Sequence, residues 1–488
     1  MDSPRVSVAV VGGGITGLAT SYYLERAAEE EGWELDGVLI EQDGRLGGKL
    51  VTVEEDGFIV EGGPDSFLAQ KPWALRLIAE MGMEDELLYG GSHRVGLLSR
   101  GRLHGIPDGL VGVAPTRPWA LWAASFLSLR GKLRASLEPF VPRARDSAPE
   151  TVAGFFRRRL GVELSQALAE PFTAGIYAGD AEELGLRDTF PMLSEMEQKH
   201  GSLARGIRAA RSGRGSGNGA SRPAFASLRR GMASLPSAVA GALTRFDVRL
   251  GRGVTDLAVD AGSPRRYGLA LSGGDAVSTD CVVLAVPAHR AAEIVRAAVP
   301  LASRTLGRSA FASTASVTLA FRRDAVGHRL DGSGFVVPRA ETSALTACSY
   351  SSSKWPGRSP DGRVLVRAFL GWRRDDTFAK RDDASLIALV TEELRPLLAL
   401  RGQAESSWVH RWPMAMPQYR VGHRKWVGSV ESALAAHPGL LVAGASYGGV
   451  GVPDCVRQGR EAAEAIRCHI SGRPNRPSSE MVGTAGSR

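Results

Sequence analysis

The chain contains 488 residues, a length typical of two or three domains. Its composition, 43% hydrophobic and 23% charged, is that of an ordinary globular protein and excludes collagen, coiled coil and wholesale disorder. Lysine and arginine (60) exceed aspartate and glutamate (52), so the net charge is +8. This surplus suits an acidic partner, namely nucleic acid, anionic lipid or a carboxylate-bearing small molecule, or it merely reflects an arginine-rich proteome.

Neither the cysteines nor the apolar segments indicate export or membrane insertion. The four cysteines form no CxxC pair, which argues against a disulfide framework, a zinc site and an iron–sulfur cluster, so we expect no metal. The N-terminus lacks a signal-peptide pattern, and the apolar stretch around residues 119–129 is about half of the roughly 20 residues that a spanning helix needs. We therefore expect a cytoplasmic protein.

The chain opens with the pattern of a β-α-β unit. An apolar run of strand length, residues 5–11, leads into Gly12-x-Gly14-x-x-Gly17, and a helical pattern follows. This spacing is typical of a dinucleotide site, since Gly12 allows the tight turn, Gly14 lets the backbone approach a pyrophosphate, and Gly17 lets helix and strand pack closely. A turn that only joins a strand to a helix is the alternative.

A second strand, residues 37–40, ends at Glu41, whose carboxylate can accept hydrogen bonds from ribose hydroxyls. The motif Arg45-x-Gly47-Gly48-Lys49 then places a cation and two glycines where a second diphosphate contact is needed. This combination resembles the FAD-binding opening of the large flavoprotein family that contains amine oxidases, phytoene desaturases and protoporphyrinogen oxidases. The resemblance favours FAD over NAD.

The pattern changes after the first domain. Residues 96–210 are mainly helical in pattern, with a capping box at 147–150. Residues 211–224 are rich in glycine, serine and arginine and predict a flexible loop. Long β-like runs between 310 and 430 predict a mainly antiparallel sheet in a lobe of its own, and the tail 473–488 has a composition typical of disorder.

Five further blocks carry a closer resemblance. They are GFIVEGGPDSF (57–67), EPFTAGIYAGD (170–180), SSSKWP (351–356), RWPMAMPQYRVGH (411–423) and AGASYGGVGVPDC (443–455). Together with the first β-α-β unit they resemble the protoporphyrinogen/coproporphyrinogen oxidases of the soluble, Gram-positive-like type, and they span nearly the whole chain. The second and fifth blocks are the specific ones.

The resemblance implies a discontinuous FAD site. The residues that it assigns to the cofactor are Gly12, Gly13, Gly14, Ile15, Thr16, Gly17, Glu41, Gln42, Arg45, Gly48, Lys49, Gly63, Pro64, Asp65, Ser66, Val254, Trp412, Val450, Gly451 and Val452. A helix that begins near Pro453 would direct its positive end at the flavin and stabilise negative charge that develops on reduction. Glycines that only turn a strand into a helix are the alternative.

For the substrate, the resemblance indicates Lys71, Gly175 and Ile176. A flat tetrapyrrole needs apolar walls and cations for its propionates, although Lys71 also has the features of a surface lysine. No recurring spacing of histidine, aspartate and serine is present, and we assign no catalytic side chain, because the flavin N5 is the hydride acceptor.

The fold class that follows is α/β, a Rossmann-like FAD-binding domain of the p-hydroxybenzoate-hydroxylase/amine-oxidase type with a β-sheet substrate domain and an inserted helical domain. The predicted boundaries are 1–95, 225–300 and 431–472 for the FAD domain, 96–210 for the helical domain and 301–430 for the substrate domain.

The implied reaction is a six-electron oxidation of a porphyrinogen by FAD and molecular oxygen, which releases hydrogen peroxide, as part of heme biosynthesis. Coproporphyrinogen III is favoured over protoporphyrinogen IX, partly because the positive net charge suits four propionates. An amine oxidase or carotenoid desaturase, and a flavin-binding interaction protein without turnover, are the alternatives. We expect no nucleic acid partner; peripheral membrane contact through the basic, tryptophan-bearing segment 117–145 and hand-over to a ferrochelatase are left open.

Overall fold

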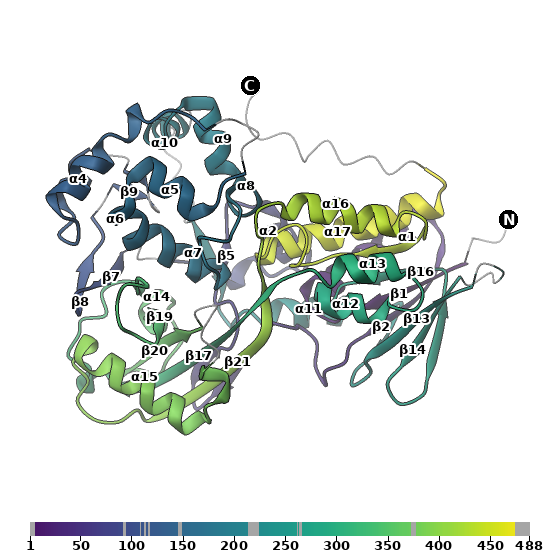
Figure 1. Ribbon diagram of the computed structural model, residues 1–488. Helices are drawn as coiled ribbons and strands as arrows, with labels where there is room; N and C mark the ends of the chain where they lie inside the picture. Colours follow the sequence, from purple (N-terminus) through teal and green to yellow (C-terminus); the bar gives the residue numbers. More distant parts are fainter. Residues whose placement is uncertain are drawn as a thin grey trace.

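The computed structural model describes residues 5–90, 94–107, 109–111, 114–115, 118–144, 149–212, 224–260, 262, 266–371 and 377–473. An α/β region, a helical region and a region built on a large sheet lie side by side in Figure 1. The predicted flexible loop and tail lie almost wholly outside the described residues.

A five-stranded parallel sheet forms the centre of the α/β region. Its order is β12 (Phe246–Arg249), β2 (Glu34–Ile40), β1 (Arg5–Val11), β16 (Cys281–Leu284) and β22 (Leu440–Val442). In β1, Val8 and Val10 join the core on one face, whereas Ala9 and Val11 join the core on the other. Burial on both faces explains why this strand reads as a continuous apolar run.

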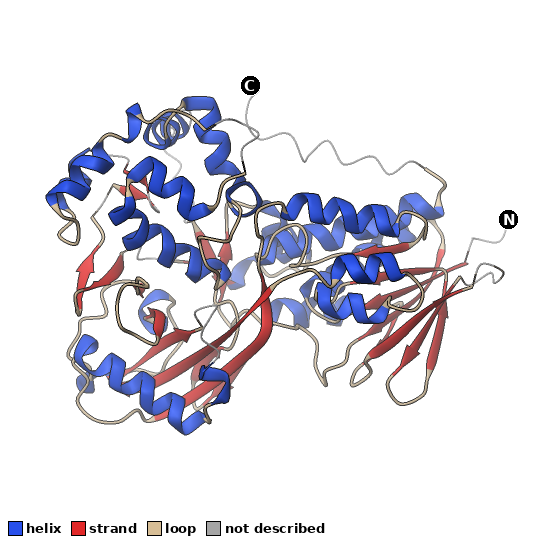
Figure 2. Cartoon of the chain, in the orientation of Figure 1, coloured by secondary structure: helices blue, strands red, loops and turns tan. Residues whose placement is uncertain are grey.

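Helices cover one face of this sheet, and helices with a second sheet cover the other (Figure 2). The first face packs against α1 (Ile15–Glu31), α2 (Pro72–Glu80), α11 (Ser234–Ala242) and α17 (Val452–Ile470). The second packs against the antiparallel strands β13 (Val254–Val259), β14 (Tyr267–Leu271) and β15 (Ala276–Thr279), and against α12 (Ala288–Ile294), α13 (Pro300–Leu306) and α16 (His423–Leu434). Because α1 follows β1 and α17 follows β22, both helices begin at the carboxyl edge of the sheet.

A seven-stranded mixed sheet forms the second region. Its order is β21 (Ser406–Pro417), β17 (Phe311–Arg322), β20 (Arg363–Leu370), β19 (Leu345–Ser349), β18 (Gly334–Val336), β7 (Val95–Ser99) and β8 (Arg102–Gly105). Only β18 and β7 pair in parallel among the described strands of this sheet. Helix α15 (Asp383–Leu398) packs on it through Leu386, Val390 and Leu394.

Two small elements join this sheet to the α/β region. They are the hairpin of β3 (Thr52–Glu55) and β4 (Phe58–Glu61), and a sheet of β5 (Phe67–Leu68), β11 (Phe225–Leu228) and β6 (Leu87–Tyr89).

The predicted helical domain begins too early at its first boundary. Residues 96–105 belong to β7 and β8 of the large sheet. In β7, Leu97 packs in the core of the helical region, and Leu98 packs in the core of the large sheet. A strand with apolar residues on successive positions is buried on both sides, and such a run has no helical period. The predicted bounds of the substrate domain, 301–430, likewise fall inside α13 and α16, which both pack on the α/β sheet.

The helical region comprises short helices around one apolar core. They are α3 (Pro118–Ala123), α4 (Leu129–Ser136), α5 (Val152–Leu160), α6 (Val162–Leu164), α7 (Glu170–Tyr177), α8 (Leu186–Thr189), α9 (Pro191–His200) and α10 (Leu203–Ser212), with single turns at Glu138–Phe140 and Ser165–Ala169. Across the residues that the structure describes, no helix is both long enough and apolar enough to cross a membrane.

Candidate functional site

The turn between β1 and α1 has the three properties that a dinucleotide turn needs. Gly12 has a φ of +106°, and an added methyl group would lie 2.9 Å from the Ala285 carbonyl oxygen. At Gly17 a methyl group would lie 1.9 Å from the Gly12 oxygen, so only glycine allows this contact between turn and helix. At Gly14 a methyl group would meet no atom within 4 Å. The open side of Gly14 lies at the positive end of α1, which is where a diphosphate fits.

The second glycine motif packs directly on this turn. The Gly47 amide donates to the Gly13 carbonyl at 2.8 Å, and a methyl group on Gly48 would lie 3.1 Å from the Gly14 Cα. Arg45 Nη2 donates to the Gly48 carbonyl at 2.7 Å. Arg45 therefore supports its own loop, and the loop forms one wall beside Gly14.

Glu41 ends β2 beside the same turn. Its Oε2 accepts a hydrogen bond of 2.6 Å from the Gly13 amide, and the residue is only 8% exposed. Gln42 lies next to the start of β13, because a methyl group on Gly253 would lie 3.5 Å from the Gln42 Cβ, and Val254 is buried. The structure thus brings together the residues predicted for the ribose and adenine end.

Lys49 and Trp412 meet the turn that follows β4. Lys49 Nζ donates to the Ala415 carbonyl on β21, and burial lowers the pKa of this ammonium group. A methyl group on Gly63 would lie 1.8 Å from the Lys49 carbonyl oxygen, so the two backbones touch. Trp412 Nε1 donates to the Gly62 carbonyl at 2.8 Å.

The next residues of this turn are held by an ion pair. Lys354 Nζ lies 2.9 Å from each carboxylate oxygen of Asp65, and Ser66 Oγ donates to Asp65 at 2.6 Å. Burial alone would raise the pKa of Asp65, but the Lys354 ammonium outweighs it and holds that pKa well below its usual range. Pro64 is exposed. Asp65 therefore orders the loop, and its side-chain oxygens already have partners.

The loop after β22 is held by two side chains that the sequence did not assign. Tyr419 Oη accepts from the Gly449 amide at 2.8 Å and donates to the Ala445 carbonyl at 2.7 Å. Gln458 Oε1 accepts from the Gly444 and Gly448 amides at 3.2 and 3.1 Å.

This loop ends at Gly451, the N-cap residue of α17. Val450 is half-buried against the helical core, and Val452 is buried in the α/β core. A methyl group on Gly459 would lie 2.6 Å from the Thr16 carbonyl oxygen, so α17 crosses the first turn of α1 closely. The N-termini of α1 and α17 both lie at the carboxyl edge of the sheet, and Ile15 and Thr16, in the first turn of α1, are buried.

The three predicted substrate residues have different surroundings. Gly175 and Ile176 are exposed on α7, whereas the adjacent Tyr177 is buried with its ring 5.8 Å from that of Tyr419. Because Tyr419 also binds the loop before α17, this exposed face of α7 lies near the predicted flavin end. Lys71, in contrast, is paired with Asp454 on α17.

The sequence interpretation missed the arginines beneath the Gly62–Gly63 turn. Arg367 donates to the Gly63 and Gly62 carbonyls at 2.7 and 2.9 Å, and Arg358 pairs with Glu61 at 3.2 Å. The only local signal was a basic residue inside the apolar run of β20, RVLVRAFL. A buried charge in a strand needs a specific partner.

No cluster of three or more histidine, cysteine, aspartate or glutamate side chains suited to a metal occurs among the described residues. The site consists of glycine turns, two helix N-termini and an acidic residue at a strand end.

These features have a counterpart in known proteins. Residues 15–467 match the family model of the flavin containing amine oxidoreductases. The chain belongs to this family. The predictions of an FAD-binding fold, of FAD as the cofactor and of an oxidoreductase are thereby confirmed.

Three relatives cover nearly the whole chain. A coproporphyrinogen III oxidase of Bacillus subtilis (strain 168) is 36% identical over 95% of this chain and 98% of its own. A coproporphyrinogen III oxidase of Propionibacterium freudenreichii subsp. freudenreichii is 35% identical over 98% of this chain and 94% of its own. A solved structure from Exiguobacterium sp. 255-15, named provisionally as a protoporphyrinogen oxidase, has a TM-score of 0.84 and 32% identity over 96% of this chain and 99% of that one. The predicted resemblance is confirmed.

Proposed function

We propose that this flavoenzyme oxidises coproporphyrinogen III to coproporphyrin III in heme biosynthesis, with molecular oxygen as the final acceptor and hydrogen peroxide as the second product. The observation that carries the proposal is the open glycine turn at Gly14 on the same sheet edge as the start of α17, in a chain 36% identical to a coproporphyrinogen III oxidase. FAD, when bound, supplies the acceptor for the electrons and hydrogen removed from the substrate.

The residues of the chain bind the cofactor and the substrate and orient them. The Gly14 backbone and the N-terminus of α1 bind a diphosphate. The Glu41 carboxylate, whose oxygens accept from the Gly13 and Asp43 amides, has lone pairs left to accept hydrogen bonds from the ribose hydroxyls. The N-terminus of α17 at Gly451 favours negative charge at the other end of the cofactor. Ile176, 47% exposed, offers an apolar wall to the macrocycle.

The substrate preference rests on charge and on the relatives' names. Four propionates suit a chain of net charge +8 better than two, and the relatives from Bacillus subtilis and Propionibacterium freudenreichii are coproporphyrinogen III oxidases. The test compares kcat/KM for coproporphyrinogen III and protoporphyrinogen IX on one preparation, followed by porphyrin fluorescence and oxygen consumption. A higher kcat/KM for protoporphyrinogen IX would reverse the assignment. If a polyamine, and neither porphyrinogen, bleached the flavin under anaerobic conditions, the protein would instead be an amine oxidase.

An exposed apolar surface on the helical region supports peripheral contact with an anionic membrane. Its large side chains, each about half exposed or more, are Trp119, Trp122, Leu129, Leu133, Leu137 and Phe140. Arg130 and Lys132 lie between them along α4, and such a mixture of apolar and basic residues binds anionic lipid interfaces.

Flotation with vesicles of anionic or neutral lipid tests this contact. We expect binding to anionic vesicles that Phe140→Glu removes and Leu301→Glu, an equally drastic change on the exposed surface of α13, does not. A different result would assign the surface to product hand-over instead. In that case the protein would bind neither kind of vesicle, but an immobilised ferrochelatase would retain it, and Phe140→Glu would abolish this retention.

A further inference from the structure

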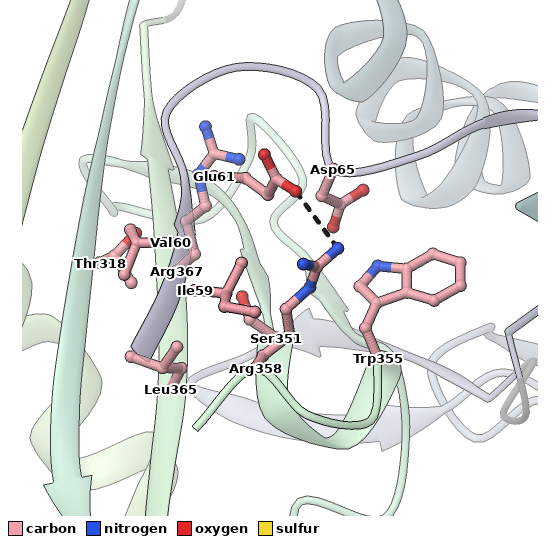
Figure 3. Close-up of a pocket in the computed structure, with 10 residues that line it drawn as sticks. All are labelled: Ile59, Val60, Glu61, Asp65, Thr318, Ser351, Trp355, Arg358, Leu365 and Arg367. Carbon is pink, nitrogen blue, oxygen red and sulfur yellow. Dashed lines mark ion pairs between the residues drawn. The ribbon is translucent and has the colours of Figure 1, made fainter. Parts of the chain in front are cut away.

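Two backbone segments predicted for the cofactor are held by different parts of the molecule. Near the Gly62–Gly63 turn, Figure 3 shows the Arg358 guanidinium directed toward the Glu61 carboxylate, and this pair joins the β3–β4 hairpin to the connection before β20. The loop after β22, in contrast, is held by Tyr419, which lies on the short connection between β21 and α16. Because Tyr419 also packs in the helical core, it links the α/β region to the helical region.

The loop after β22 has little means of fixing its own backbone. Gly448, Gly449 and Gly451 have no side chains, and glycine loses more conformational freedom on ordering than any other residue. Gly449 has a φ of +122°, and a methyl group on it would lie 2.6 Å from the Asp454 Cγ, so a residue with a side chain cannot replace it. The order of this loop must therefore come from partners outside it.

The Tyr419 hydroxyl supplies such a partner twice. It accepts from the Gly449 amide and donates to the Ala445 carbonyl, which a hydroxyl can do at the same time. Burial raises the pKa of Tyr419 well above its ordinary value, so the hydroxyl keeps the proton that it donates. One side chain thus fixes the loop at two points four residues apart.

The same residue is tied to α7, which carries the predicted substrate residues. The Tyr177 ring on α7 lies 5.8 Å from the Tyr419 ring, and the His423 ring stacks on Tyr419 at 3.8 Å. Next to it, Gln418 Nε2 donates to the Tyr177 carbonyl at 2.8 Å, and the Gly185 amide donates to the Tyr419 carbonyl at 2.8 Å. The connection around Tyr419 therefore sets where α7 lies relative to the loop.

The fixed part of the loop leads directly to amides that are available to a ligand. The amides of Gly448 and Gly449 already donate to side chains. For the next two amides, those of Val450 and Gly451, the part of the chain that the structure describes offers no acceptor. Free amides at a helix N-terminus stabilise negative charge, so their placement matters for a flavin that becomes negative on reduction.

We propose that Tyr419 is a positioning residue, which holds the Gly449–Gly451 backbone in the place that the flavin ring needs and keeps it aligned with the substrate face of α7. The alignment with α7 rests on the proposed function, whereas the effect on the flavin does not depend on the substrate. Hydride transfer requires the two reacting atoms within a narrow range of distance and angle. Loss of the hydroxyl should therefore slow transfer more than it weakens substrate binding.

Two phenylalanine variants provide a matched comparison. Tyr419→Phe removes the hydroxyl that binds the loop. Tyr447→Phe removes another buried hydroxyl, which lies on the same loop and has no partner among the described residues. Each change keeps the aromatic ring, so a difference between the variants reports the two hydrogen bonds.

The first measurement needs no porphyrinogen. The FAD-loaded proteins are reduced without oxygen in the presence of a reference dye, and the flavin and dye spectra give the redox equilibrium. We expect Tyr419→Phe to shift this equilibrium about tenfold toward oxidised flavin, and Tyr447→Phe to change it by less than about twofold. Hydrogen exchange of the peptide that contains Gly449 should become faster only in Tyr419→Phe.

The second measurement follows turnover of coproporphyrinogen III. We expect Tyr419→Phe to lower kcat about tenfold and to change KM by less than about twofold. Unchanged dye equilibrium and kcat in Tyr419→Phe, or a change in KM alone, would overturn the proposal. A shifted dye equilibrium in a protein that oxidises no porphyrinogen would refute the proposed function but support the positioning of the flavin loop by Tyr419.

A second substitution keeps the test open if Tyr419→Phe does not fold. Replacement of Tyr419 by 3-fluorotyrosine retains the hydroxyl, but the more acidic phenol is a weaker acceptor for the Gly449 amide. The dye equilibrium should then shift in the same direction by a smaller factor, and an unchanged equilibrium would overturn the proposal.

Discussion

Lys71 Nζ lies 2.7 Å from both carboxylate oxygens of Asp454, and this ion pair joins residues 383 positions apart. Lys71 is the N-cap residue of α2, and Asp454 lies in the first turn of α17. The Lys71 side chain is 44% exposed, whereas that of Asp454 is only 12% exposed. A propionate that reaches Lys71 must therefore compete with a carboxylate that is already seated at the start of α17.

Substitution of each residue of the ion pair tests whether Lys71 binds the substrate. We expect Lys71→Met to raise the KM for coproporphyrinogen III and Asp454→Asn to lower it, because the second change frees the ammonium group. Each change should lower the free energy of unfolding by about 1 kcal/mol, since one partner is substantially exposed. Steady-state kinetics and urea unfolding measure the two effects separately. A loss of stability with unchanged KM in both variants would make the pair purely structural and remove Lys71 from the substrate site.

Two alanine substitutions in the first turn should differ in whether the protein still folds. Gly17→Ala places a methyl group 1.9 Å from the Gly12 oxygen, so we expect little folded protein. Gly14→Ala has space around the new methyl group and a backbone at φ −70°, which alanine adopts readily, so the protein should fold and bind FAD at least about tenfold more weakly. Circular dichroism reports folding, and flavin absorbance after purification reports binding. A yellow, fully loaded Gly14→Ala protein would contradict the assignment of this turn to the diphosphate.

The first turn could be predicted because all its functional residues lie within a few positions of one another. Spacing alone placed Gly12, Gly14 and Gly17, and the structure gives each the surroundings that its expected role requires. The resemblance extended the site to distant blocks, and the family match supports the cofactor but leaves the individual contacts of Glu41 and Trp412 with FAD as proposals.

The ion pairs beneath the site could not be predicted in the same way. Asp65 and Lys354 are 289 positions apart, and only the packing of the β3–β4 hairpin against the large sheet brings them together. Arg367 carried a signal, a charge within an apolar strand, but its partners are backbone carbonyls that no residue pattern identifies. Sequence therefore predicted the glycine turns of the candidate site, but not the polar side chains that hold them.

The helical region contains a buried charge network whose loss should be severe. Arg159 is fully buried, forms an ion pair with Glu138 and lies 3.0 Å from Glu197. We expect Arg159→Met to lower the free energy of unfolding by about 3–5 kcal/mol, because it leaves a buried carboxylate without its partner. Arg157→Met, on the same helix but in a half-exposed pair with Glu182, should cost less than about 1 kcal/mol. Similar urea midpoints for both variants would contradict this difference.

Asp65 should contribute stability that disappears in acid. Its pKa in the folded protein lies below the ordinary value because the Lys354 ammonium outweighs the effect of burial. The contribution is therefore present above the unfolded pKa of about 3.9 and is lost as pH falls toward the folded value. Asp65→Asn should be destabilised at neutral pH, and the difference from the parent protein should shrink below about pH 4. Urea unfolding of both proteins from pH 3 upward measures this difference in the free energy of unfolding. A difference that stays constant over that range would contradict the lowered pKa of Asp65.

Glu61 should show the opposite dependence on pH. Burial raises its pKa despite the Arg358 guanidinium at 3.2 Å and the hydrogen bond that Thr52 donates to it. A raised folded pKa means that the folded protein binds the proton more tightly, so stability falls as pH rises from the unfolded pKa of about 4.3 to the folded value. The Glu61→Gln protein, in which this side chain stays neutral, should not show this fall. Its free energy of unfolding should therefore rise relative to that of the parent protein as pH increases through that window. Because the charge of Asp65 also acts on Glu61, both variants must be measured at the same ionic strength. A Glu61→Gln profile parallel to that of the parent protein would show that Arg358 keeps this carboxylate charged.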